Sequence, residues 1–100
     1  MFRITFGKGF HVEFENGVTV STQFGEGNYC NNRNGIERTE MGFVECEDSE
    51  VAIWGKEGEW LTREYYHSIN EIAGDDVKGS VSPKELLNIL NWAENYNDEV

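Results

Sequence analysis

Apolar and polar side chains alternate with a period of two through the first 24 residues of this chain. Phe2, Ile4 and Phe6 share one face, and the segments 10–14 and 18–24 repeat the pattern. Because successive side chains of a β-strand point to opposite faces, each run predicts a strand with one apolar face. Such strands must pair and bury that face, so the pattern predicts an antiparallel sheet covered on one side.

The loop between the second and third runs fixes how these two strands pair. A two-residue loop at Asn16-Gly17 would place Phe14 opposite Thr19 and mix apolar with polar side chains on both faces. A three-residue loop, 15–17, ends on glycine, which the left-handed last position of such a loop favours. We predict the three-residue loop, because a slip of one residue would turn every side chain to the wrong face. The predicted pairs are Phe14 with Val18, Val12 with Val20 and Phe10 with Thr22.

A second hairpin of the same kind is predicted further along the chain. The strand-like segments 51–54 and 60–62 flank a loop, 56–58, which again ends on glycine. The predicted pairs are Trp54 with Trp60 and Ile53 with Leu61.

The remaining segments outside the C-terminal region give weaker patterns. Residues 42–46 predict one more strand, which brings the sheet to about five or six strands. We expect turns at 74–76 and 78–80, because these triplets combine glycine with polar residues. Large aromatic rings more often belong to a core than to a ligand cage, and we expect this of all three tryptophans. They are Trp54, Trp60 and Trp92.

A helix is predicted to start after Ser82. Ser82-Pro83-Lys84-Glu85 places serine at the N-cap, proline at the first helical position and glutamate at the third, as in a capping box. Apolar residues then recur at helical spacing, so we predict a helix over Pro83–Asn95 that packs on the apolar face of the sheet. The chain is thus predicted to be one α+β domain, 1–100, with an antiparallel meander of about five or six strands and a single C-terminal helix.

The net charge excludes several classes of function. Nineteen Asp and Glu residues against eight Lys and Arg give a formal charge of -11, which repels nucleic-acid phosphate and anionic lipid. We expect no direct nucleic-acid binding and no membrane binding, but attraction to a partner protein with a basic surface. No segment approaches the roughly 20 apolar residues of a membrane span, and the first residues lead directly into a strand. These features predict a cytoplasmic protein without a signal peptide.

One acidic stretch is a candidate partner-binding patch. The chain has no basic residue between Arg38 and Lys56, and spaced carboxylates on a rigid sheet can imitate a row of phosphates and compete for a cationic groove. In the predicted strand, Glu45 and Glu47 share a face that points away from Cys46. The alternative is a solvated face that keeps the protein soluble. The candidate residues are Glu40, Glu45, Glu47, Asp48 and Glu50.

Residues 25–35 form a loop with more chemistry than a turn requires. Its glycines and asparagines favour a backbone with exposed N–H groups, Arg33 offers a charge for phosphate, and Tyr29 offers a ring that can stack on a base. A ligand or partner site and a plain connection of successive turns both fit this composition. No helix is predicted after the glycines, so they are not a dinucleotide-binding fingerprint. The candidate binding residues are Asn28, Tyr29, Asn31, Asn32, Arg33 and Arg38.

The cysteines and histidines give no catalytic or metal signature. Cys30 would need His11 or His67 as a base to act as a nucleophile, and nothing in the sequence places either beside it. Two histidines and two cysteines without short ligand spacings are a poor zinc set. We therefore expect no enzyme activity, no metal and no cofactor, with Cys30 and Cys46 as free thiols in a reducing compartment.

Two segments resemble small proteins encoded by phages and prophages. They are 2–33, with its Gly-Lys-Gly, Glu-Asn-Gly and Phe-Gly-Glu-Gly-Asn-Tyr-Cys-Asn-Asn-Arg motifs, and 82–93. The resemblance implies a setting, in which small acidic proteins without catalytic motifs often bind and block host machinery, defence systems included. The expected function is non-enzymatic inhibition of a host system in the host cytoplasm, through the acidic surface and the 25–35 loop. The alternative is a sponge that sequesters a nucleotide-type immune signal in this loop, and a homo-oligomer is compatible with both.

Overall fold

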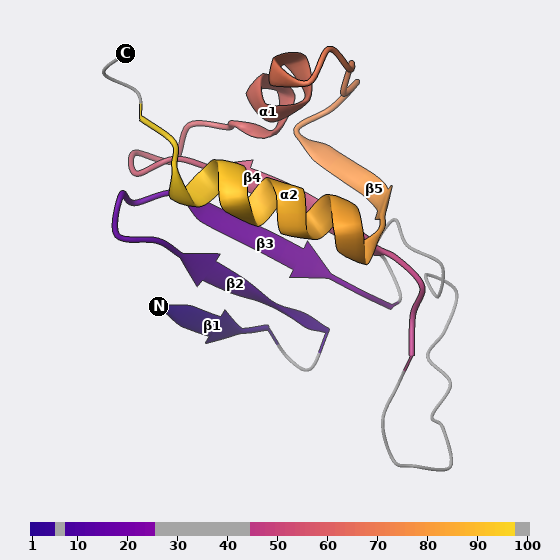
Figure 1. Ribbon diagram of the computed structural model, residues 1–100. Helices are drawn as coiled ribbons and strands as arrows, with labels where there is room; N and C mark the ends of the chain where they lie inside the picture. Colours follow the sequence, from indigo (N-terminus) through magenta and orange to yellow (C-terminus); the bar gives the residue numbers. More distant parts are fainter. Residues whose placement is uncertain (6–7, 26–44, 98–100) are drawn as a thin grey trace.

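The protein has an α+β fold with two layers, a five-stranded antiparallel sheet and a pair of helices that share its core (Figure 1). The computed structural model describes residues 1–5, 8–25 and 45–97. The sheet is a meander, because its spatial order β1-β2-β3-β4-β5 follows the chain. The elements are β1 (Phe2–Ile4), β2 (Gly9–Glu13), β3 (Thr19–Gln23), β4 (Ser49–Trp54), α1 (Thr62–Ser68), β5 (Val77–Val81) and α2 (Pro83–Glu94).

The predicted pairing of β2 with β3 is confirmed. Val12 lies opposite Val20 and Phe10 opposite Thr22, and the Phe14 N–H donates to the Val18 carbonyl at 2.9 Å. The three-residue loop ends on Gly17 with a φ of 88°, which a residue with a Cβ rarely adopts.

The second predicted hairpin is confirmed at both of its predicted pairs, since the Leu61 N–H also donates to the Ile53 carbonyl at 2.9 Å. Trp54 pairs with Trp60 in an isolated bridge, and Gly58 takes the left-handed conformation with a φ of 86°. The predicted strand 60–62 does not continue, because Thr62 begins α1. The fully buried Thr62 hydroxyl accepts a hydrogen bond from the Ile53 N–H at 2.9 Å, so it takes the place of a strand partner for β4.

One prediction in the middle of the chain is wrong, and one element there was not predicted. The turn expected at 78–80 lies inside β5, where Ser80 takes a φ of 56° and the register with β4 shifts between Ser49 and Val51. The short helix α1 falls in a region where no helix was predicted. The bend expected at 74–76 is present.

The strand predicted over 42–46 is not found in its described part. Residues 42–44 lie outside the described residues, while Glu45 and Cys46 precede β4 and belong to no strand. Glu45 is nevertheless exposed and Cys46 half-buried, so the two side chains differ in exposure as the alternation predicted.

The start of α2 is confirmed. The Ser82 hydroxyl accepts a hydrogen bond from the Glu85 N–H at 3.2 Å, and the helix ends at Glu94, one residue before the predicted end. The Glu85 carboxylate accepts a hydrogen bond from the Tyr66 hydroxyl, which ties α2 to α1. Within the described residues, neither helix has the length and apolar character needed to cross a membrane.

The core lies between the sheet and α2, which crosses β3 in Figure 1. Trp92 packs partly buried against this core, as predicted. The same prediction is wrong for Trp54 and Trp60. Ile53 faces the core, so its neighbour Trp54 points to the opposite face of the sheet, and Trp60 is 53% exposed. The core residues are Val18, Val20, Val51, Ile53, Leu61, Tyr65, Tyr66, Val81, Ile89 and Ala93.

Candidate functional site

The loop that the sequence marks as a ligand site lies mostly outside the described residues, which resume at residue 45. Its role in binding a partner or a nucleotide therefore stays a prediction. The candidate residues concerned are Asn28, Tyr29, Asn31, Asn32, Arg33, Arg38 and, from the acidic patch, Glu40.

The described part of the predicted acidic patch leads into β4. Glu45 and Glu47 are exposed, and Glu50 lies within the strand opposite Gln23. Glu45, Asp48 and Glu50 each already interact with other residues of the chain. The patch is therefore four carboxylates close together in sequence, and their use as a phosphate-like row stays a prediction.

The structure gathers a different set of carboxylates around a cavity at the end of α2. Glu57 and Glu59 come from the hairpin loop after β4, and Glu94 from the last turn of α2. The cavity has a volume of about 700 Å³ and is open and mostly polar. We call these three exposed residues and the cavity they line the acidic pocket. The other lining residues are Asn16, Val18, Gly55, Lys56, Asn95, Tyr96 and Asn97.

Asn16 holds the elements of the acidic pocket together. Its side-chain amide donates to the carbonyls of Ala93 at 2.8 Å, Tyr96 at 3.1 Å and Glu94 at 3.3 Å. Its Oδ1 accepts from the Val18 N–H at 3.0 Å, which fixes the loop that carries it. The β2–β3 loop thus satisfies carbonyls that a helix end leaves without intrahelical partners.

The loop after β4, which contains Lys56, is packed against the β2–β3 loop, which contains Gly17. A Cβ on Gly17 would lie 2.7 Å from the Lys56 Cβ, so the two hairpin loops approach too closely for any larger residue. The Glu59 carboxylate folds back and accepts from the Glu57 N–H at 3.0 Å. These contacts give the acidic pocket a fixed frame built from two loops and one helix end.

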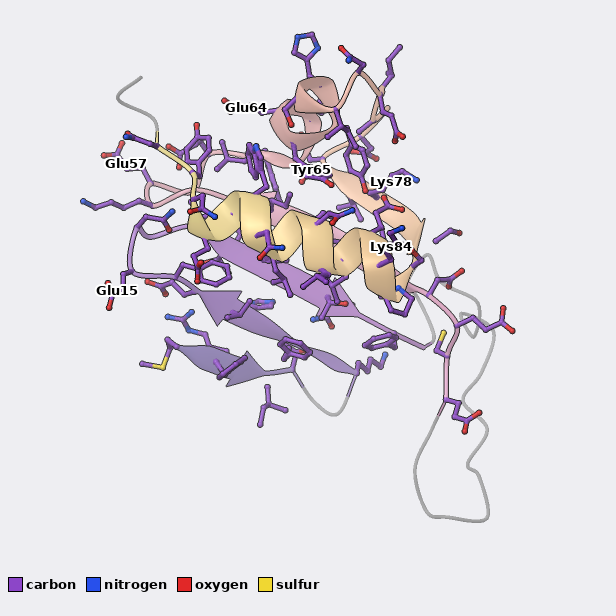
Figure 2. All side chains as sticks on the ribbon, in the orientation of Figure 1. Glu15, Glu57, Glu64, Tyr65, Lys78 and Lys84 are labelled. Atoms are coloured by element: carbon purple, nitrogen blue, oxygen red, sulfur yellow. The ribbon has the colours of Figure 1, made fainter. Side chains whose placement is uncertain are left out.

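The electrostatic environment of the acidic pocket favours a cation. A helix C-terminus carries about half a negative charge, and the last turn of α2 contains no basic residue to offset it. Lys56 is the one basic side chain among the lining residues. Figure 2 shows Glu15 and Glu57 at the end of the molecule where α2 ends, while Lys78 and Lys84 lie beside its start. The carboxylates of the acidic pocket therefore add to the negative end of the helix dipole.

A further group of carboxylates, around α1, is partly neutralised. Arg63 forms an ion pair with Asp76 at 3.6 Å, and the Tyr96 hydroxyl lies 3.3 Å from both carboxylate oxygens of Glu64. These partners make this group a weaker candidate for binding a cation than the acidic pocket.

Two side chains with shifted pKa values stay uncharged near neutral pH. Burial, followed by the hydrogen bond to Glu85, raises the pKa of the Tyr66 hydroxyl far above its usual range. Burial, followed by the charge of Arg3, lowers the pKa of His11, whose ring packs edge-on against Trp54 at 5.0 Å. Both groups are held by packing contacts, which explains their positions without a catalytic role.

The expected absence of a catalytic or metal site stays a prediction. Cys46 is a free, half-buried thiol, while Cys30 lies outside the described residues. Among residues 1–5, 8–25 and 45–97, no group of three or more His, Cys, Asp or Glu side chains is arranged to hold a metal ion.

Sequence reasoning missed the acidic pocket because its parts are distant in the chain. Asn16 reads as an ordinary turn residue, and the contact with Ala93 joins residues 77 positions apart. The one available sign was a helix whose last turn has a glutamate and no basic residue, since helices usually favour cations there.

Comparison of the chain with protein-family models, with curated proteins and with solved structures finds no match.

Proposed function

We propose that this protein is a non-enzymatic binding protein, encoded by a phage, that inhibits a host protein by occupying its basic surface. The observation that carries the proposal is the acidic pocket, in which three exposed carboxylates and a helix C-terminus surround a cavity with a single lysine. The resemblance to phage and prophage proteins supports the setting in a host cell.

The chemistry of the acidic pocket fits a lysine or arginine side chain of a partner protein. A cation 4 Å from one carboxylate gains about 1 kcal/mol in water and about 4 kcal/mol at the effective dielectric of a protein surface. The mostly polar lining would not favour an apolar ligand, because small-molecule pockets are usually lined by hydrophobic side chains. The net charge of -11 adds long-range attraction to a basic partner and raises the association rate.

The predicted acidic patch gives the partner a second point of contact. It leads into β4 at Ser49, and the loop of the acidic pocket follows β4 after Trp54, so the six-residue strand separates them by about 17 Å. This distance equals the axial length of about five phosphate steps in one DNA strand. Two acidic groups at that spacing would suit a host protein whose basic groove normally holds nucleic acid.

The test compares a variant in which three carboxylates of the acidic pocket are replaced by amides with a control variant in which three carboxylates elsewhere are replaced, so that both have the same net charge. Glu57→Gln, Glu59→Gln and Glu94→Gln are combined in one variant, and Glu71→Gln, Asp75→Asn and Asp76→Asn in the control. A host protein captured on the wild type is purified, and its affinity for each variant is measured by calorimetry at several salt concentrations. At about 0.5–1 kcal/mol for each exposed charge, we expect the pocket variant to bind about 10- to 100-fold more weakly.

The control should bind within about 2-fold of the wild type, and added salt should weaken the wild-type complex. Two results would contradict the proposal: affinity that ignores salt, or equal losses in the pocket variant and the control. A protein that binds no host protein, but binds nucleotides in a titration panel, would also overturn it.

A further inference from the structure

Among the described strands, β1 lies at an edge of the sheet, with no described strand on its outer side. Met1 and Glu13 exchange two hydrogen bonds, at 3.0 and 2.8 Å, and the Thr5 N–H donates to the first residue of β2 at 3.0 Å. Residues that bond to a neighbouring strand alternate with residues that do not. Phe2 and Ile4 therefore direct their N–H and C=O groups away from β2, toward the free edge.

The same two residues expose large apolar side chains. Phe2 is 71% exposed and Ile4 is 84% exposed. They lie on the sheet face that carries α2, since Phe2 pairs with the core-packed Val12 and its ring lies 6.0 Å from that of Phe10. Figure 1 shows that α2 crosses β3, which leaves β1 beyond the reach of the helix. An edge with apolar side chains, and with backbone groups that no residue in the described ranges pairs, is a template for strand addition.

The charge distribution identifies the strand that can be added. Residues 1–12 contain no Asp or Glu, although the whole chain contains nineteen. The first carboxylate, Glu13, forms an ion pair with Arg3 at 2.8 Å, which neutralises the main charge on β1. Two copies of a chain with a charge of -11 repel each other most where carboxylates are dense. The edge at β1 lies in a twelve-residue segment without carboxylates, whereas β5, the other edge strand of the described sheet, directly follows Asp75 and Asp76.

We propose that β1 binds a second copy of this chain across a two-fold axis, so that the two five-stranded sheets become one continuous sheet. An antiparallel arrangement centred on Arg3 pairs Phe2 of each copy with Ile4 of the other. Each of these two pairs exchanges two backbone hydrogen bonds. Both α2 helices then lie on the same face of the joined sheet, and the four apolar side chains pack together between them. Such an interface is self-complementary, as a two-fold axis requires.

The size of the contact predicts a weak dimer. At about 200 Å² for a whole side chain of this size, the exposed parts of the four apolar side chains come to roughly 600 Å². With the strand backbone and flanking residues, the interface reaches about 1,000 Å², the lower end for specific association. The dimer should therefore form in a concentration-dependent manner.

Salt should strengthen this dimer, because it screens the repulsion between two acidic chains. The Debye length falls from about 30 Å at 0.01 M salt to about 8 Å at 0.15 M and about 3 Å at 1 M. Binding to a basic host protein should respond in the opposite way. Self-association and the proposed function are thus distinguished by the sign of their salt dependence.

Sedimentation velocity of the full chain, over a range of concentrations and at about 0.02 and 0.5 M salt, tests the proposal. Ile4→Glu places a charge on the edge and should weaken the dimer at least 10-fold, since charged side chains block strand addition. Ile72→Glu is the matched control, because Ile72 is 94% exposed, lies outside β1 and gains the same charge. The control should dimerise within about 2-fold of the wild type, and urea unfolding should show that both variants fold.

Hydrogen exchange provides a direct readout of the interface. The Ile4 amide should become protected as the wild-type concentration rises, and this protection should be lost in Ile4→Glu at neighbouring β1 amides. A monomer at every concentration and salt level would overturn the proposal. A dimer that Ile4→Glu leaves intact, or one that Ile72→Glu weakens as much as Ile4→Glu does, would also overturn it. Protection of the Ile4 amide by a strand of a different protein, while this chain stays monomeric, would overturn it as well.

Discussion

The Asn16 contacts predict that one exposed loop residue stabilises the whole fold. In Asn16→Ala, the carbonyls of Ala93 and Tyr96 and the Val18 N–H lose a side-chain partner. One amide nitrogen has two hydrogens, so at most two of its three contacts are full hydrogen bonds at once. With the bond that Oδ1 accepts, three bonds at about 0.5–1.5 kcal/mol each are lost, and water compensates in part at this exposed site. We expect the free energy of unfolding to fall by about 1.5–3 kcal/mol.

Asn16→Asp distinguishes the effect of the hydrogen bonds that the Asn16 amide donates from the effect of having a side chain of this shape at the position. Aspartate keeps the shape of asparagine and the acceptor for Val18, but it replaces the donor with a negative charge at a helix C-terminus, close to Glu94. We expect this variant to be less stable than Asn16→Ala at low salt, by about 0.5–1 kcal/mol. The difference should shrink at high salt, where the charges are screened.

Urea denaturation followed by circular dichroism measures these changes, with the slope of the transition as a check that the unfolded state is unaltered. Asn88 is exposed on α2 and provides matched controls, Asn88→Ala and Asn88→Asp, which should lie within about 0.5 kcal/mol of the wild type. An Asn16→Ala variant as stable as these controls, or an Asn16→Asp variant more stable than Asn16→Ala, would refute the stabilising role of the Asn16 hydrogen bonds.

Two further stability predictions concern the sheet and the start of α2. The Thr22 hydroxyl is buried and has no hydrogen-bond partner among the described residues. Thr22→Val should therefore raise the free energy of unfolding by about 1 kcal/mol, measured by urea denaturation. A lower free energy of unfolding would show that the hydroxyl forms a hydrogen bond in the native protein. Ser82→Ala removes the acceptor for the Glu85 N–H and should cost about 0.5–2 kcal/mol, and an unchanged midpoint with an unchanged slope would count against the N-cap.

The hairpins and the start of α2 could be predicted because their determinants are local. Gly17 and Gly58 occupy left-handed positions that the loop length demands, and Ser82 with Pro83 marks a helix start within two residues. α1 lacked such a signal. Leu61 stands at its N-cap without a side-chain hydrogen bond, and tyrosine and histidine are only moderate helix formers. Packing of the buried Tyr65 and Tyr66 stabilises this helix, and packing is a tertiary effect.

The errors at β5 and at the tryptophans have the same origin. Lys78-Gly79-Ser80 has the composition of a turn, and only pairing with the irregular register of β4 makes it a strand. Trp54 and Trp60 pair as predicted, but the sequence does not show which face of the sheet the helices cover. The acidic patch could be predicted because its residues are close together in the sequence, whereas only the folded chain brings Glu57 and Glu94 together in the acidic pocket.

The order of the strands has a consequence for how the chain reaches its native state. Each strand of the meander pairs with the one before it, so the contacts of the sheet can form one after another with short loop closures, apart from the longer connections that precede β4 and β5. The bond from Asn16 to Ala93 spans 77 residues and carries a larger entropic cost of loop closure. Folding should therefore begin in the hairpins and end with the docking of α2. Contacts that form after the transition state slow unfolding more than they speed folding, so the hydrogen bonds of Asn16 to the end of α2 should mainly slow unfolding of the native protein.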